Sequence, residues 1–167
     1  EDFIVYLVKT YKISHVEKVQ MNHSDDFIKK MHDLGCLVIT KQTRTRLPRN
    51  TYDAITLNGF EAAGYGADLS LLEIFKKAKE NTTERLIPSG GIATKEQIDY
   101  YMDNGALAVC IGTLFAASEE SQIADKTKRE LIERTSADIK YMSRSRQRGL
   151  IYKDEDDPLG RSLKKGI

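Results

Sequence analysis

The chain of 167 residues has no tryptophan, three prolines and two cysteines. It also lacks any apolar run near the roughly 20 residues that a membrane-spanning helix needs, and no signal-peptide pattern opens it. An excess of one charge is missing too, since 26 basic residues balance 25 acidic ones. Nucleic-acid-binding proteins normally carry a basic face. We therefore expect a cytoplasmic protein with no membrane partner and no nucleic-acid partner.

The two cysteines, Cys36 and Cys110, both lie inside apolar, strand-like runs. We interpret them as buried thiols rather than as a disulfide or a metal-binding pair. The three histidines show no ligand spacing with a cysteine or a carboxylate, so we expect no metal site.

Two apolar runs that end in glycine are the most informative feature of the sequence. One reads Ile-Pro-Ser-Gly-Gly-Ile over 87–92, and the other reads Ala-Leu-Ala-Val-Cys-Ile-Gly-Thr over 106–113. A helical stretch over 94–103 separates them. Glycine lets the backbone approach a phosphate closely and adopts positive φ. In many (β/α)8 barrels the phosphate site follows strands 7 and 8, so the pattern predicts two phosphate-anchoring loops late in a barrel.

The remaining sequence predicts further strand and helix units. Apolar spacing indicates helices over 2–13, 24–34 and 70–80, and strands over 16–22, 36–40, 52–58 and 85–87. On the first strand we expect Val16 and Lys18 to face outward, and Val19 and Met21 to face inward. A complete barrel takes about 250 residues. We therefore predict an α/β fold that is the C-terminal half of a (β/α)8 barrel, with the N-terminal half missing from this chain.

Two segments depart from this alternation of strands and helices. Residues 41–51 are basic, contain a proline and have no helical period, so we expect a solvated loop, the alternative being contact with an anionic substrate. Beyond residue 115 the sequence predicts a charged helix over 118–134 and then a polar tail. We divide the chain accordingly into a partial barrel with phosphate-binding loops, 1–117, and a C-terminal helix with its tail, 118–167.

Three motifs stand in order along the chain. They are Asp-Ala-Ile-Thr-Leu-Asn-Gly-Phe-Glu-Ala-Ala-Gly-Tyr-Gly at 53–66, Ile-Pro-Ser-Gly-Gly-Ile at 87–92, and Gly-Ala-Leu-Ala-Val-Cys-Ile-Gly-Thr-Leu-Phe at 105–115. Together they resemble the nitronate monooxygenases, formerly called 2-nitropropane dioxygenases, a family that includes the FMN-dependent enoyl-ACP reductases. The resemblance covers 53–121. It implies a (β/α)8 barrel that binds FMN non-covalently and acts on a small-molecule substrate.

The resemblance also implies which groups would bind the cofactor. The glycine turns and the residues beside them would hold the phosphate, with a small residue close to the flavin and two residues bordering its isoalloxazine ring. The implied residues are Asn58, Gly59, Ser89, Gly90, Gly91, Ile92, Gly112 and Thr113. The spacing by itself indicates a phosphate and does not distinguish a flavin from a sugar phosphate.

The resemblance departs at Tyr65, where the family has a histidine that is its proposed catalytic base or substrate-orienting group. Imidazole titrates near neutral pH, while a phenol in a model peptide titrates near pH 10. A tyrosine can donate a hydrogen bond to an oxyanion but is a poor base at pH 7. A second candidate, His23, follows a predicted strand at the edge where barrel active sites lie. For Tyr65 and His23 the alternative is a structural role.

We expect an FMN-dependent oxidoreductase that oxidises a nitronate or nitroalkane, or reduces an enoyl substrate. One alternative is a truncated or divergent relative without catalysis that serves as a binding or oligomerising module. Another is a phosphate-binding barrel of other chemistry, such as a dehydrogenase of the inosine-monophosphate type, which would need a catalytic cysteine on a loop. If 1–167 is the full chain, we expect a homodimer, because open sheet edges invite pairing.

Overall fold

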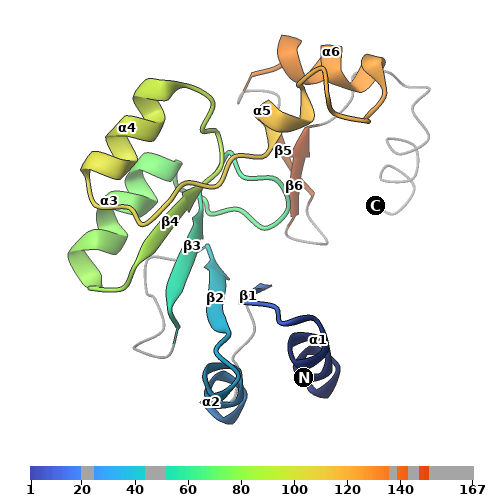
Figure 1. Ribbon diagram of the computed structural model, residues 1–167. Coiled ribbons are helices and arrows are strands. Elements are labelled where there is room, and N and C mark those ends of the chain that lie inside the picture. Colours follow the sequence, from blue (N-terminus) through green and yellow to red (C-terminus); the bar gives the residue numbers. More distant parts are fainter. Residues whose placement is uncertain (20–24, 44–51, 136–138, 143–146, 151–167) are drawn as a thin grey trace.

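A parallel sheet of four strands forms the centre of the protein (Figure 1). The computed structural model describes residues 1–19, 25–43, 52–135, 139–142 and 147–150. The strands β1 (His15–Val19), β2 (Leu37–Gln42), β3 (Ala54–Asn58) and β4 (Leu86–Ser89) pair in sequence order, each parallel to the next. Consecutive parallel strands need crossovers, and the helices α2 (Asp25–Asp33) and α3 (Leu71–Asn81) lie in two of them. This is the strand order that the sequence predicted.

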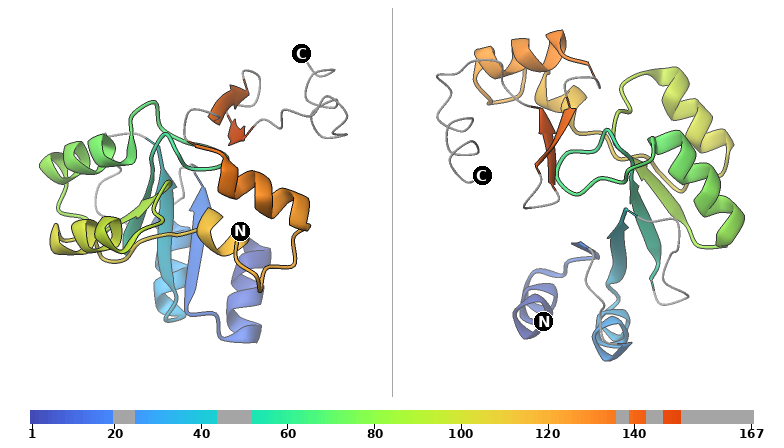
Figure 2. Two further views of the ribbon diagram at one scale, coloured as in Figure 1. Left: turned by 90° about the horizontal axis from the view of Figure 1, so that it is seen from above. Right: turned by 180° about the vertical axis from the view of Figure 1, so that it is seen from behind.

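Helices cover one face of this sheet. The helices α3 and α4 (Lys95–Asp103) lie together beside β3 and β4, while α2 packs on β2 and contacts α1 (Asp2–Tyr11) (Figure 2). The rings of Phe75 on α3 and Tyr101 on α4 meet edge to face, with centroids 5.1 Å apart. Two apolar clusters result, and their least exposed members include Ile55, Leu57, Ile74 and Phe75 in one and Phe27, Met31 and Val38 in the other.

Local signals explain where these helices begin and end. Ser70 and Thr94 each form a capping box. The side chain of each cap accepts a hydrogen bond from the backbone N–H three residues later, and the side chain of that later residue, Glu73 or Gln97, accepts one from the backbone N–H of the cap. Gly35 follows α2 with φ +70°, a conformation that glycine adopts without strain. The helix boundaries predicted at these three residues are confirmed.

On β1 the structure differs from the predicted orientation at Val16, Lys18 and Val19, while Met21 lies outside the described residues. Val16 packs against the cluster beneath the helices, whereas Val19 is 41% exposed. Alternate residues of a strand face opposite sides, so the register places Val19 and Glu17 on the same face as Lys41 and Thr56, away from the helices. Spacing alone did not show which face of this edge strand would be covered.

The predicted strand over 106–111 is present only as a short addition to the sheet. Cys110 forms one parallel bridge with Ser89, and the N–H groups of Leu107 and Cys110 donate to the carbonyls of Leu86 and Pro88, both at 2.8 Å. Cys110 is exposed, contrary to the prediction of a buried thiol, because it lies at the edge of the sheet. Cys36 is buried as predicted, and both cysteines are free.

The C-terminal part also differs from the prediction. The helix predicted over 118–134 is limited to α6 (Asp125–Glu133), and a single turn, α5 (Thr113–Ala116), precedes it. The antiparallel pair β5 (Ile139–Met142) and β6 (Gln147–Leu150) occupies part of the expected polar tail. Among the described residues, no helix has the length and apolarity to cross a membrane.

Candidate functional site

Three residues lie in one row where neighbouring strands end. Asn58 and Ser89, the last residues of β3 and β4, are direct partners across the ladder, and Ser89 is bridged in turn to Cys110. The loop 59–66, the turn 90–91 and the turn 112–113 follow these three positions. Parallel strands end at a common edge, where α/β folds place their ligands. Figure 1 shows α5 and α6 toward this same end of the sheet.

The first two of these loops are packed tightly on each other. Gly59 N–H donates to Ser89 C=O at 3.0 Å. Gly90 has φ +112°, and a Cβ placed on it would lie 2.6 Å from the backbone nitrogen of Ala62. Gly91 has φ +71°, and its Cβ would lie 3.0 Å from the Cβ of Glu61. The glycine pair is therefore required by contact with the loop 59–66, a role that the sequence did not reveal.

Glu61 holds the same loop to the start of α3. Its Oε2 accepts a hydrogen bond from the Leu71 N–H at 3.2 Å. Gly59 packs against the same point, because a Cβ on Gly59 would lie 2.5 Å from the Leu71 Cα. Gly59, predicted to border a flavin ring, thus has a packing role that explains its identity without a ligand.

Asn58 has an unusual buried side chain. It is 3% exposed, and its Nδ2 donates to the backbone carbonyl of Tyr65 at 2.8 Å, which ties the loop to the strand end. Its Oδ1 is buried and has no hydrogen-bond partner, and it is the one such side-chain atom found in the part of the chain that the structure describes. A buried acceptor without a partner costs about 1–3 kcal/mol, so a missing donor at this point is a reasonable expectation.

Backbone N–H groups are available on the neighbouring turns. Within the described ranges, neither Gly91 nor Ile92 donates a hydrogen bond from its N–H. The start of α4 is different, because the N–H groups of Ala93 and Thr94 both donate to Gln97 Oε1. The N–H groups of Gly91 and Ile92 are therefore available to an anion, whereas those of Ala93 and Thr94 are already occupied.

The other predicted residues differ in their accessibility. Gly112 and Thr113 are exposed, and a Cβ on Gly112 would have no atom within 4 Å, so this turn is open. The Ile92 side chain is buried in the core cluster and can contribute only its backbone. Tyr65 is 38% exposed. His23 lies outside the described residues.

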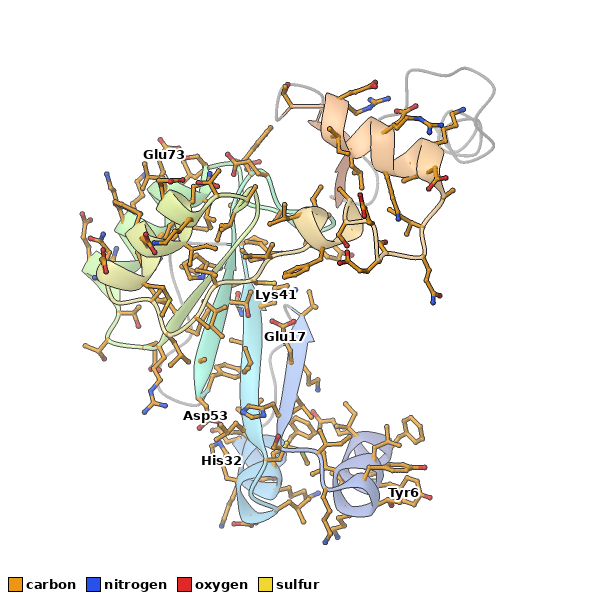
Figure 3. All side chains as sticks on the ribbon, turned by 45° about the horizontal axis from the view of Figure 1, so that its top comes forward. Tyr6, Glu17, His32, Lys41, Asp53 and Glu73 are labelled. Carbon is orange, nitrogen blue, oxygen red and sulfur yellow. The ribbon has the colours of Figure 1, made fainter. Side chains whose placement is uncertain are left out.

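A polar cluster on the uncovered face of the sheet was not predicted. Glu17 on β1 accepts a hydrogen bond from Thr56 on β3 at 2.5 Å, and Lys41 Nζ lies 3.2 Å from the other oxygen of Glu17 (Figure 3). Lys41 is the ladder partner of Thr56. Thr56 stands two residues before Asn58 on β3, so the two side chains lie on the same face of the sheet. The available signal was Lys41, a charged residue at the end of the apolar run 36–40. The sequence predicted Lys41 in the loop 41–51, whereas the structure places it on β2.

A second polar group lies at the opposite end of the strands. Asp53 accepts hydrogen bonds from the Val38 N–H and from His32 Nε2, each at 2.8 Å (Figure 3). Burial raises the pKa of Asp53, but these bonds and the nearby positive charges outweigh it and hold the pKa below its usual value. The amino ends of barrel strands contribute to stability rather than to catalysis, so we assign this pair a structural role.

Comparisons with known proteins bear on the fold and the family. The chain is similar to FabK from Thermotoga maritima, with 22% identity and a TM-score of 0.79 over 98% of this chain and 53% of that one. A point mutant of the same FabK gives a TM-score of 0.80, with 99% and 55% covered. Nitroalkane oxidase from Streptomyces ansochromogenes has 22% identity and a TM-score of 0.75, with 90% and 48% covered.

The chain thus spans about half the length of these structures, and the predicted partial (β/α)8 barrel is confirmed. No curated protein matches the sequence. A family model described as nitronate monooxygenase, however, matches residues 5–152, nearly the whole chain. On this match and the three motifs, the chain belongs to the nitronate monooxygenase family.

Proposed function

We propose that this chain provides the phosphate-holding and ring-facing part of an FMN site in an oxidoreductase. The observation that carries the proposal is the buried, unpartnered Oδ1 of Asn58 at the edge where the glycine turns meet. The isoalloxazine ring of a flavin has an imide N–H, which is the kind of donor that this oxygen lacks. The free N–H groups of Gly91 and Ile92 on the neighbouring turn suit a phosphate.

Lys41 lies on the uncovered face of the sheet, in the layer below Asn58, where its ammonium group is paired with Glu17. This pair carries no net charge, so the candidate donors to an anionic group at this edge are the N–H groups of Gly91 and Ile92. When bound, FMN supplies the redox chemistry, and the protein supplies binding and orientation.

The proposed substrate class rests on the chemistry of tyrosine at residue 65. A tyrosine can donate a hydrogen bond to a substrate oxygen but is a poor base at neutral pH. We therefore propose oxidation of a nitronate, which is already an anion, before that of a neutral nitroalkane, with reduction of an enoyl compound as a further option. A relative that has lost catalysis and retains a binding role is the competing proposal.

The first test is the visible absorption spectrum after addition of FMN and desalting. Retained flavin absorption supports the cofactor site, and a colourless protein that binds no FMN supports the binding-module alternative. Gly112→Asp is the informative variant, because Gly112 has negative φ and open space, so the fold should tolerate it. We expect the added carboxylate to weaken FMN binding at least tenfold by repulsion of the phosphate, while Gly112→Ala binds nearly as the parent. Equal binding by the two variants would remove Gly112 from the cradle.

A second variant tests the role assigned to Tyr65. Tyr65→His restores a group that accepts a proton near pH 7. We expect turnover of a neutral nitroalkane to rise by about 10²-fold, the lower range for a positioned base, while turnover of the corresponding nitronate changes little. A parallel change for both substrates would show that residue 65 does not take part in proton abstraction.

A further inference from the structure

The loop 59–66 leaves the sheet and returns to it at one residue, Asn58. The Asn58 Nδ2 donates to the Tyr65 carbonyl at 2.8 Å, and the Ala67 N–H donates to the Asn58 carbonyl at 3.1 Å. The side chain and the main chain of Asn58 thus close the loop together. Compact loops whose ends meet in this way often carry functional residues.

The two halves of this loop are held by different groups. In the first half, Glu61 Oε2 accepts a hydrogen bond from the Leu71 N–H at 3.2 Å, which fastens that half to the start of α3. In the second half, Gly64 has φ +78° and open space around its Cβ position, and the backbone of the next residue, Tyr65, is bonded to the side chain of Asn58. The position of residue 65 therefore depends on the Asn58 amide.

The Asn58 amide has made one of its two kinds of hydrogen bond. Its Nδ2 holds residue 65, while its Oδ1 is buried without a partner. Because the amide is conjugated, a donor that bonds to the oxygen polarises the N–H bond and strengthens the hydrogen bond that the nitrogen donates. The same donor also fixes the plane of the amide, and with it the direction in which Nδ2 points.

We propose that Asn58 is a positioning residue that couples occupation of the flavin site to the position of residue 65. The inference rests on the proposed function, in which the imide N–H of the ring donates to Asn58 Oδ1. The same amide then holds the Tyr65 carbonyl more firmly. The side chain at position 65 is therefore fixed relative to the ring once the ring is bound, and Asn58 acts on the substrate through Tyr65.

The test is hydrogen exchange of the amides in 60–67, measured by mass spectrometry on the whole chain with three probes. They are FMN, FMN methylated on the imide nitrogen, and inorganic phosphate, each at a saturating concentration. We expect FMN to slow exchange by about three- to tenfold, the effect of strengthening one hydrogen bond by roughly 10–30%. The methylated analogue covers the loop as FMN does but has no imide donor, so it should protect these amides less. Phosphate should leave them unchanged.

Two variants separate the coupling from a general loss of stability. In Asn58→Leu the side chain has a similar size but neither a donor nor an acceptor. The amides in 60–67 should exchange faster in this variant without ligand, and FMN and its methylated analogue should protect them equally. Asp53→Asn is the matched control, because Asp53 stands just before the same strand and its bonds are to Val38 and His32. It should respond to FMN as the parent does.

Visible absorption of the bound flavin separates failure of the coupling from failure of the proposed function. A parent chain that binds no FMN overturns both. Bound FMN that leaves the exchange of 60–67 unchanged, or that protects these amides no better than the methylated analogue, overturns the coupling alone. Protection specific to FMN that persists in Asn58→Leu also overturns it, because the coupling would then not pass through the amide.

Discussion

Replacement of Gly90 by alanine tests the contact between the two loops at the candidate site. Gly90 combines a φ of +112° with a position where a Cβ would lie 2.6 Å from Ala62 N and 2.9 Å from Ala62 Cα. Both atoms belong to the backbone, so the clash cannot be relieved by the rotation of a side chain. Gly64 is the matched control, because its φ is +78° and no atom lies within 4 Å of its Cβ position.

The expected loss of stability has two parts. A non-glycine residue held at positive φ costs about 1–2 kcal/mol, and this part is common to Gly90→Ala and Gly64→Ala. Steric overlap in a packed region costs a further 1–3 kcal/mol, roughly, and only Gly90→Ala incurs it. The lower chain entropy of an unfolded alanine variant offsets both substitutions equally. We therefore expect Gly90→Ala to be less stable than Gly64→Ala by about 1–3 kcal/mol.

Urea unfolding followed by far-UV circular dichroism measures this difference. With a dependence of about 1–3 kcal/mol per molar urea, the midpoint of Gly90→Ala should lie about 1 M below that of Gly64→Ala. Equal midpoints for the two variants would refute the close contact between the turn at Gly90 and the loop at Ala62.

Two further predictions concern polar groups away from the glycine pair. The pKa of Asp53 is lowered in the folded protein, so its carboxylate stabilises the fold above the unfolded value near pH 4, and this stabilisation is lost as the pH falls through the folded pKa. We expect Asp53→Asn to destabilise the protein by about 1–2 kcal/mol at pH 7. The variant should also show a flatter acid limb in a plot of unfolding free energy against pH. An unchanged acid limb would show that the bonds from Val38 and His32 do not stabilise the Asp53 carboxylate. Ser70→Ala removes the acceptor of the Glu73 N–H, and a loss of about 1 kcal/mol in unfolding free energy is expected. A urea midpoint equal to that of the parent would show that the capping box at α3 contributes nothing.

Local signals were sufficient for much of the fold. The capping residues Ser70 and Thr94 and the glycine after α2 depend on contacts within one helical turn, so their effect can be inferred from neighbouring residues. Apolar runs likewise located β2, β3 and β4, because a strand buried beneath helices is mostly apolar, while alternation located β1. The family motifs, which are also local, predicted the membership that the family model confirms.

Long-range contacts account for what the sequence did not reveal. The sequence indicated glycine at 90 and 91 as a feature of a phosphate loop, whereas the structure shows that Ala62, about thirty positions earlier, leaves no room for a side chain at Gly90 and that Glu61 crowds Gly91. The ion pair between Glu17 and Lys41 and the hydrogen bond between Glu17 and Thr56 span three strands. No periodicity within one strand could predict these pairs.

The sequence by itself determined the order of strands, helices and glycine turns, because each is set by interactions between residues a few positions apart. Only the tertiary structure decided which face of β1 is covered, why Cys110 is exposed, and that Asn58 has a buried oxygen without a donor. These properties depend on which elements pack against one another across the sheet. Burial and hydrogen-bond satisfaction are consequences of that packing, and a residue's own neighbours in the chain do not specify them.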